Sequence, residues 1–179
     1  YTVTVTDAQG CTATASVTGT EPLLLAVTAS GTNASCFGVC NGTTSTVTSG
    51  GTTPYTYAWT GPTAIAGSAG ATLCAGTYTV TVTDSKGCIA TASYTVTEPP
   101  LLTVVVTGND ASCFGICDGD ATATPSGGTS GYTYQWNPAG GLGTAATTAS
   151  SLCAGTAGVT VTDALGCIAT GTFAITEPT

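Results

Sequence analysis

Threonine alternates with apolar residues along much of the chain, and this alternation predicts β-strands. Over residues 77–83, Tyr78 and two valines share one face while threonines occupy the other, which is the period of a half-buried strand. A turn rich in Asp and Gly follows at residues 84–87, and every second residue of 88–96 is apolar. Together these segments predict a β-hairpin.

Three more strands are expected upstream of this hairpin. Residues 23–28, 43–48 and 55–60 carry the β-branched and aromatic patterns of strands, and one or two short strands are expected between residues 61 and 73. Helix formers other than alanine are scarce. The sequence therefore predicts an all-β protein.

The pattern repeats along the chain. The segment that begins at Tyr1 returns 77 residues later at Tyr78, and a partial copy follows after another 79 residues. The two extra residues fall between Trp136 and Cys153, in a Gly/Ala/Thr-rich stretch that we interpret as a loop.

Glu-Pro pairs mark the expected boundaries, because proline lacks the N–H that a strand ladder needs. They give the C-terminal hairpin of a truncated unit at 1–21, a full unit at 22–98 and a second full unit at 99–179. The chain begins within an expected penultimate strand, so we expect a window from a longer tandem array.

The expected architecture is a row of immunoglobulin-like antiparallel β-sandwiches of about 77–79 residues each, stapled by disulfides. Six or seven short strands with one tryptophan on a middle strand indicate such a sandwich. Tyr78 stands where these domains often carry a tyrosine corner, whereas the last unit has Ala157 there. We therefore expect the unit 99–179 to be the less stable one.

Composition excludes several functions. Charged residues are 6% of the chain, with one Lys, no Arg and no His. Nucleic-acid binding is excluded because nothing can neutralise a row of phosphates. No apolar run reaches the roughly 20 residues that cross a bilayer, so we expect no membrane insertion. Without His, a catalytic site is hard to assemble, and we expect neither enzyme activity nor a cofactor.

Nine cysteines predict disulfides and an oxidising, extracellular location. Each full unit has four, namely Cys36, Cys40, Cys74 and Cys88, then Cys113, Cys117, Cys153 and Cys167. Cys11 corresponds to Cys88, and we expect its partner to lie outside this segment. Zinc is disfavoured, because Cys-x3-Cys occurs once per unit without His or a second close pair.

The pairing of the cysteines follows in part from the expected topology. In an immunoglobulin-like sandwich the second and penultimate strands run parallel, which favours Cys40–Cys74 and Cys117–Cys153 near the tryptophans; such a loop stabilises the fold by about 4 kcal/mol. Cys36 pairs either with Cys88 of its own unit or with Cys167 of the next. We expect the pairing within the unit, and the alternative stays open.

Several polar and aromatic residues are candidates for ligand or sugar attachment. Asn33 and Asn41 lie in N-glycosylation sequons, and the outward threonines are candidate O-glycan sites. Asp7, Asp84 and Asp163 are interpreted as turn residues. Asp110, Asp118 and Asp120 form a candidate calcium cluster in one unit only, and the tryptophans and strand tyrosines are interpreted as core rather than as carbohydrate platforms.

The combined motifs resemble the SprB repeat. They are residues 35–36, 49–59, 75–84, 87–88 and 97–99. The Tyr-Thr-Val-Thr-Val string alone is also shared by PKD-type sandwiches, and the extra cysteine pair departs from the plainer two-cysteine form. The resemblance implies a very large secreted surface protein of Bacteroidota, with type IX secretion and no catalysis.

We therefore expect a structural segment of a stalk or extracellular filament, whose partners are neighbouring repeats, copies of itself and covalent glycans. The alternative is an adhesin module that binds glycans or surfaces. Regular filaments would favour the first role, and glycan binding by an isolated two-unit chain would favour the second.

Overall fold

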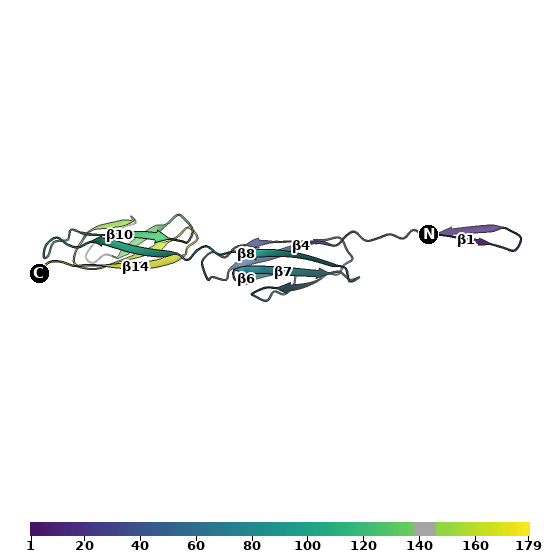
Figure 1. Cartoon of the computed structure of the whole chain (residues 1–179), viewed down its shortest axis with the longest axis horizontal. Coiled ribbons are helices and arrows are strands. Elements are labelled where there is room, and N and C mark those ends of the chain that lie inside the picture. The colour runs from purple at the N-terminus through teal and green to yellow at the C-terminus, as the bar shows by residue number, and fades with distance from the viewer. Residues whose placement is uncertain (138–145) are drawn as a thin grey trace.

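The computed structural model describes residues 1–137 and 146–179, and in them every regular element is a β-strand. An N-terminal hairpin and two sandwiches lie in a line, end to end (Figure 1). The prediction of an all-β protein built from tandem antiparallel sandwiches is confirmed.

The first sandwich consists of two three-stranded antiparallel sheets. One sheet has the order β3 (Ala26–Thr32), β4 (Gly42–Ser49), β6 (Ala69–Leu73), and the other has the order β5 (Thr56–Thr60), β7 (Gly76–Thr83), β8 (Ile89–Val96). The inward side chains of β7, which are Tyr78, Val80 and Val82, are completely buried. The alternation of threonine with apolar residues therefore sets the core face, as predicted.

The second sandwich repeats this arrangement. Its sheets are β9 (Thr103–Asn109), β10 (Gly119–Ser126) and β12 (Thr148–Leu152), in the order β12-β10-β9, and β11 (Thr133–Asn137), β13 (Gly155–Thr162) and β14 (Ile168–Ile175), in the order β11-β13-β14. Trp136 of β11 and Val159 and Val161 of β13 lie in its core. Residues 138–145, which belong to the expected loop with two extra residues, lie outside the described part of the chain.

The N-terminal hairpin has the same register as its counterparts in the sandwiches. β1 (Thr2–Thr6) and β2 (Thr12–Ser16) pair Thr2 with Ser16, as β7 and β8 pair Thr79 with Ser93. Every residue of β1 and β2 is exposed, because no other strand covers them. Local alternation and the Asp-Gly turn are therefore sufficient to define this hairpin's register.

The first strand of the unit 22–98 begins later than the sequence suggests. It was expected at 23–28 and lies at Ala26–Thr32. Leu23 and Leu24 are exposed instead, and the Leu23 carbonyl accepts a hydrogen bond from the Gly51 N–H at 2.7 Å. These leucines thus contact a turn, while the ladder with β4 continues to the pair Thr32–Thr43.

Candidate functional site at the joint between the two units

Each sandwich is closed by an internal disulfide. The structure joins Cys40 to Cys74, and Cys117 to Cys153. In each case the first cysteine precedes the second strand of the unit and the other precedes the penultimate strand. The bond therefore connects the two sheets at one end of the sandwich, where the parallel course of these strands brings their starts together.

A third disulfide crosses from one unit to the next. Cys36 is bonded to Cys167, with the two Cα atoms 5.7 Å apart. The expected pairing of Cys36 with Cys88 is therefore wrong. Cys36 follows β3 at one end of its sandwich and Cys88 precedes β8 at the other, and a strand of eight residues spans about 26 Å, whereas a disulfide requires Cα atoms within about 7 Å.

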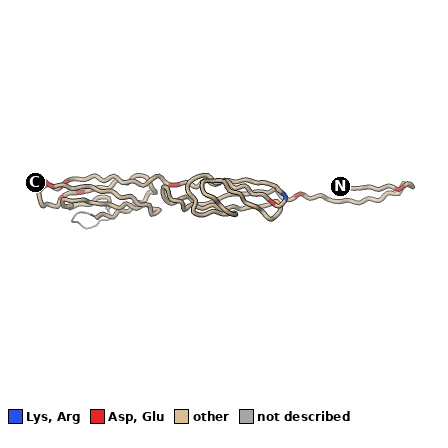
Figure 2. The backbone as a smooth tube through the Cα atoms, turned by 90° about the horizontal axis from the view of Figure 1, so that it is seen from below, with Lys and Arg blue, Asp and Glu red and all other residues tan. Residues whose placement is uncertain are grey.

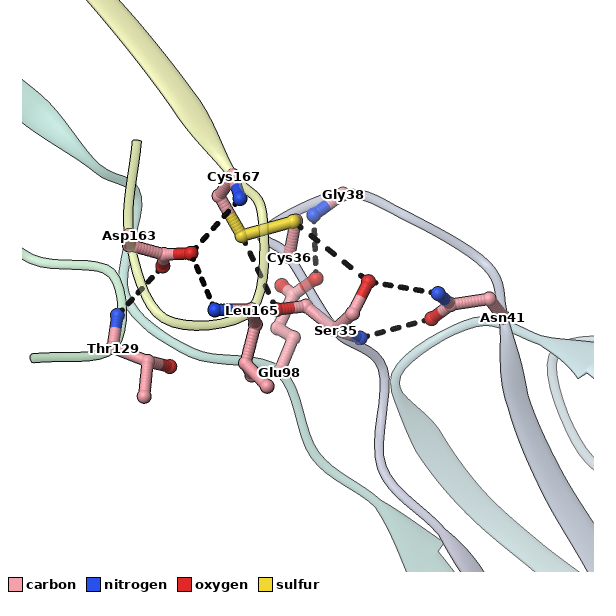
Figure 3. Close-up of a disulfide and its surroundings, with 9 residues drawn as sticks. All are labelled: Ser35, Cys36, Gly38, Asn41, Glu98, Thr129, Asp163, Leu165 and Cys167. Carbon is pink, nitrogen blue, oxygen red and sulfur yellow. Dashed lines mark hydrogen bonds between the residues drawn. A yellow bond between two sulfur atoms is a disulfide. The ribbon is translucent and has the colours of Figure 1, made fainter. Parts of the chain in front are cut away.

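Hydrogen bonds hold the loop that carries Cys36, here called the cysteine loop (residues 33–41). The Glu98 carboxylate accepts a hydrogen bond from the Gly38 N–H at 2.7 Å. Asn41 accepts one from the Ser35 N–H at 2.9 Å and donates one to the Ser35 hydroxyl at 2.7 Å (Figure 3). The loop is thus tied to the linker that leads into the next unit.

A carboxylate organises the other side of the joint, at the aspartate turn (residues 163–167). Asp163 accepts hydrogen bonds from the backbone N–H groups of Thr129 at 2.7 Å, Leu165 at 2.9 Å and Cys167 at 2.8 Å (Figure 3). Although its side chain is buried, these N–H groups, that of Thr129 above all, hold the pKa of Asp163 below its ordinary value of 3.8. The charged carboxylate therefore fixes the backbone from which Cys167 reaches Cys36.

The same two structures recur at the outer ends of the sandwiches. Asp84 binds the N–H groups of Thr52, Lys86 and Cys88 as Asp163 binds its own three. At the far end of the second sandwich, Glu177 binds Gly115, and Asp118 binds Ser112, as in the first cysteine loop. The cysteines at these ends, Cys88 and Cys113, are exposed and unbonded, as is Cys11.

The other candidate residues serve the fold of these loops. The Asn33 side chain accepts the Thr97 N–H at 3.1 Å, and its counterpart Asp110 accepts the Thr176 N–H at 2.8 Å. Asn41 is exposed but its amide nitrogen already binds Ser35. Asp110, Asp118 and Asp120 each bind a different donor, and no three His, Cys, Asp or Glu side chains converge within the described residues.

The tryptophans differ between the units. Trp136 is 3% exposed, and its indole N–H donates to the Ala146 carbonyl. Trp59 is only half-buried, and its indole N–H donates to the Gly67 carbonyl. Both side chains pack against core residues of their own unit.

The sequence analysis did not identify Glu98 and Glu177 as parts of the joint. It treated the Glu-Pro pairs only as boundaries. A signal was present, because both glutamates stand immediately before proline and each lies 62 residues after the first cysteine of its unit... a spacing of 62 for Glu98 and 64 for Glu177. A carboxylate kept at one place in each repeat of a chain with so few charges indicates a fixed partner.

A family model described as the SprB repeat matches the chain twice, over residues 28–64 and 103–141. Each match begins in the first strand of a unit and extends past the third. The resemblance to the SprB repeat is thereby confirmed. This repeat is a structural family rather than an enzyme family, and it occurs in surface proteins of Bacteroidota.

No curated protein matches the chain. Among the residues that the structure describes, no helix has the length and apolar character needed to span a membrane.

Proposed function

We propose that this chain is a segment of a stiff stalk or extracellular filament of a large secreted surface protein. The observation that carries the proposal is the double covalent connection at the joint. The peptide linker and the Cys36–Cys167 bond both cross it. A joint held at two separate points resists both bending and rotation, which a single peptide linker permits.

The distribution of charge supports the same role. Acidic residues and Lys86 gather at the ends of the units and at the hairpin tip, so the long sides are almost uncharged (Figure 2). Such sides are covered with threonine and are weakly guarded against association. In this proposal they carry covalent glycans or pack against other copies in a filament.

Immunogold electron microscopy with antibodies against this chain, on cells of the source organism, tests the proposal. The expected result is labelled extracellular filaments whose axial repeat equals one or a few units. Labelled surfaces without filaments would overturn it. Specific binding of the isolated chain to a glycan array, in that case, would support the adhesin function instead.

A further inference from the structure

We propose that the Cys36–Cys167 bond carries tension past most of both sandwiches, so that pulling on the chain cannot unravel them. This inference rests on the proposed function for its biological meaning. The bond joins residues 131 positions apart in the sequence, so a force applied at the two ends of the chain bypasses everything between Cys36 and Cys167.

The remaining covalent path follows strands that are already extended. In the first sandwich it enters at Pro22, runs through β3 and leaves at Cys36. In the second it enters at Cys167 and leaves through β14. Each of these strands lies along the line of the three bodies in Figure 1. An extended strand has almost no hidden length to release.

A second path of the same kind runs beside the first. β8 leads into the linker and then into β9, which ends before Cys113. β3 packs against β8 in one sandwich, and β9 packs against β14 in the other. The segment from Cys88 to Cys113 has 25 steps along the chain, as has the segment from Cys11 to Cys36. The two paths are therefore the same element, displaced by one unit.

This displacement assigns partners to the exposed cysteines. The bond in hand joins the end of one 25-step segment, Cys36, to the start of another, Cys167. By the same geometry, Cys113 takes the last cysteine of a unit docked at the far end, and Cys88 takes the first cysteine of a unit docked before it. The aspartate turn at Cys88 and the cysteine loop at Cys113 have the hydrogen bonds that position the bonded pair.

Formation of each such bond is an oxidation by a small-molecule disulfide. Two thiols release two protons and two electrons, one S–S bond forms between them, and the disulfide oxidant is cleaved to two thiols. A continuous array then contains two parallel covalent paths made only of strands, linkers and disulfides.

The lengths involved are large enough to measure. A chain extends by at most 3.3–3.6 Å per residue, so the bond hides roughly 450 Å of contour. Without it, each sandwich releases about 43 residues, which are the 77 of the repeat less the 34 enclosed by its internal disulfide. After subtraction of the folded span, this is a step of roughly 100 Å per unit.

Single-molecule force spectroscopy on the full oxidised chain, held at both termini, tests the load path. Cys11, Cys88 and Cys113 are changed to Ser in all samples. We expect opening of the N-terminal hairpin and no step near 100 Å, whereas adding Cys36→Ser and Cys167→Ser gives two such steps. Steps near 100 Å in the chain that keeps Cys36 and Cys167 would overturn the inference.

A second measurement does not depend on the folding of that variant. Under constant force, a reductant should release the hidden contour of the bonded chain in one abrupt event after each cleavage of the Cys36–Cys167 bond. Extension without any such event would overturn the load path. Loss of filaments in microscopy, with these force results intact, would instead overturn the filament function alone.

A longer chain tests the partners of the exposed cysteines. Residues 23–179 are placed after Pro178, which reproduces the natural Glu-Pro junction, and the chain is refolded with oxidised glutathione. Cys11, Cys88 of the first copy and Cys113 of the second are changed to Ser. Peptide mapping of the monomer should show Cys113 of the first copy bonded to Cys88 of the second. Free thiols at both positions, or an exchanged Cys36–Cys167 pair, would overturn the assignment.

Discussion

The two sandwiches fill the same space in their cores with different residues. In the unit 22–98, Tyr78 on β7 is fully buried, and its hydroxyl donates to the Cys74 carbonyl at 3.0 Å. In the unit 99–179 the equivalent residue is Ala157, and there Trp136 is buried while its counterpart Trp59 is only half-buried. One aromatic ring thus closes each core, but it comes from a different strand.

The second strand differs in the same sense. Thr44 of β4 is buried with its hydroxyl bonded to the Ser30 carbonyl, whereas the equivalent residue of β10 is Ala121. The cores of the two repeats have therefore diverged in side-chain volume and polarity. The joint has not, since both units keep the aspartate turn, the cysteine loop and the glutamate before proline. The difference indicates that core packing is replaceable here and the geometry of the joint is not.

Removal of the buried tyrosine should have the largest effect. Tyr78→Ala is expected to destabilise the unit 22–98 by about 3–5 kcal/mol, because a fully buried aromatic side chain leaves a cavity. Hydrogen exchange of the slowest amides in β7 and β13 reports the two units separately. Exchange in β7 should accelerate strongly while that in β13 stays unchanged.

The control for this change is Tyr78→Phe, which keeps the ring and removes only the hydroxyl. It should cost about 1 kcal/mol, the net contribution of a typical hydrogen bond. Equal effects of the Ala and Phe variants would show that the ring does not close this core.

The tryptophans should show the reverse asymmetry at a smaller scale. Trp136→Phe is expected to cost its unit about 2 kcal/mol, and Trp59→Phe less than about 1 kcal/mol, because only Trp136 is fully buried. The same exchange measurement in β13 and β7 checks this. If the two substitutions cost the same, burial of the ring would not be the relevant difference.

The unmodified units should also differ in stability. The absence of a tyrosine at position 157 predicts that the unit 99–179 is less stable, by about 1 kcal/mol once the burial of Trp136 offsets part of the loss. The slowest amides of β13 should therefore exchange faster than those of β7. Equal protection of the two strands would contradict the prediction.

The sequence predicted those features that depend on local pattern. The strict alternation over residues 77–83 defines β7, and the structure places that strand at Gly76–Thr83. The start of β3 was missed because three successive leucines favour a strand, whereas only Leu25 enters the core. The alternation carries no information on how far an end leucine lies from the neighbouring sheet.

The joint could be predicted only in part, because it depends on which end of a sandwich each cysteine occupies. The topology placed Cys36 and Cys88 at opposite ends, yet the distance between those ends was not weighed against the reach of a disulfide. The hydrogen bond between Glu98 and Gly38 spans 60 positions and has no local pattern. Such contacts follow from the fold rather than from any short motif.

The smallest predicted effect concerns acid, and it separates the two units once more. Hydrogen bonds keep the pKa of Asp163 below 3.8, and at Asp84 burial alone would raise the pKa, but the N–H groups of Thr52, Cys88 and Lys86 outweigh it. A lowered pKa in the folded state stabilises the protein above the ordinary value, and this contribution is lost as the pH falls through 3.8 and below.

Asp84→Asn should therefore flatten the loss of stability between about pH 5 and pH 2 in the unit 22–98 only, because the amide does not titrate. Denaturant unfolding followed by tryptophan fluorescence measures this, in a chain with Trp136→Phe so that Trp59 reports alone. The matched variant Asp163→Asn, with Trp59→Phe, should flatten the acid response of the other unit. An acid response that Asp84→Asn leaves unchanged would mean that the carboxylate does not stabilise the turn through its charge, and that the three N–H groups accept a neutral oxygen equally well.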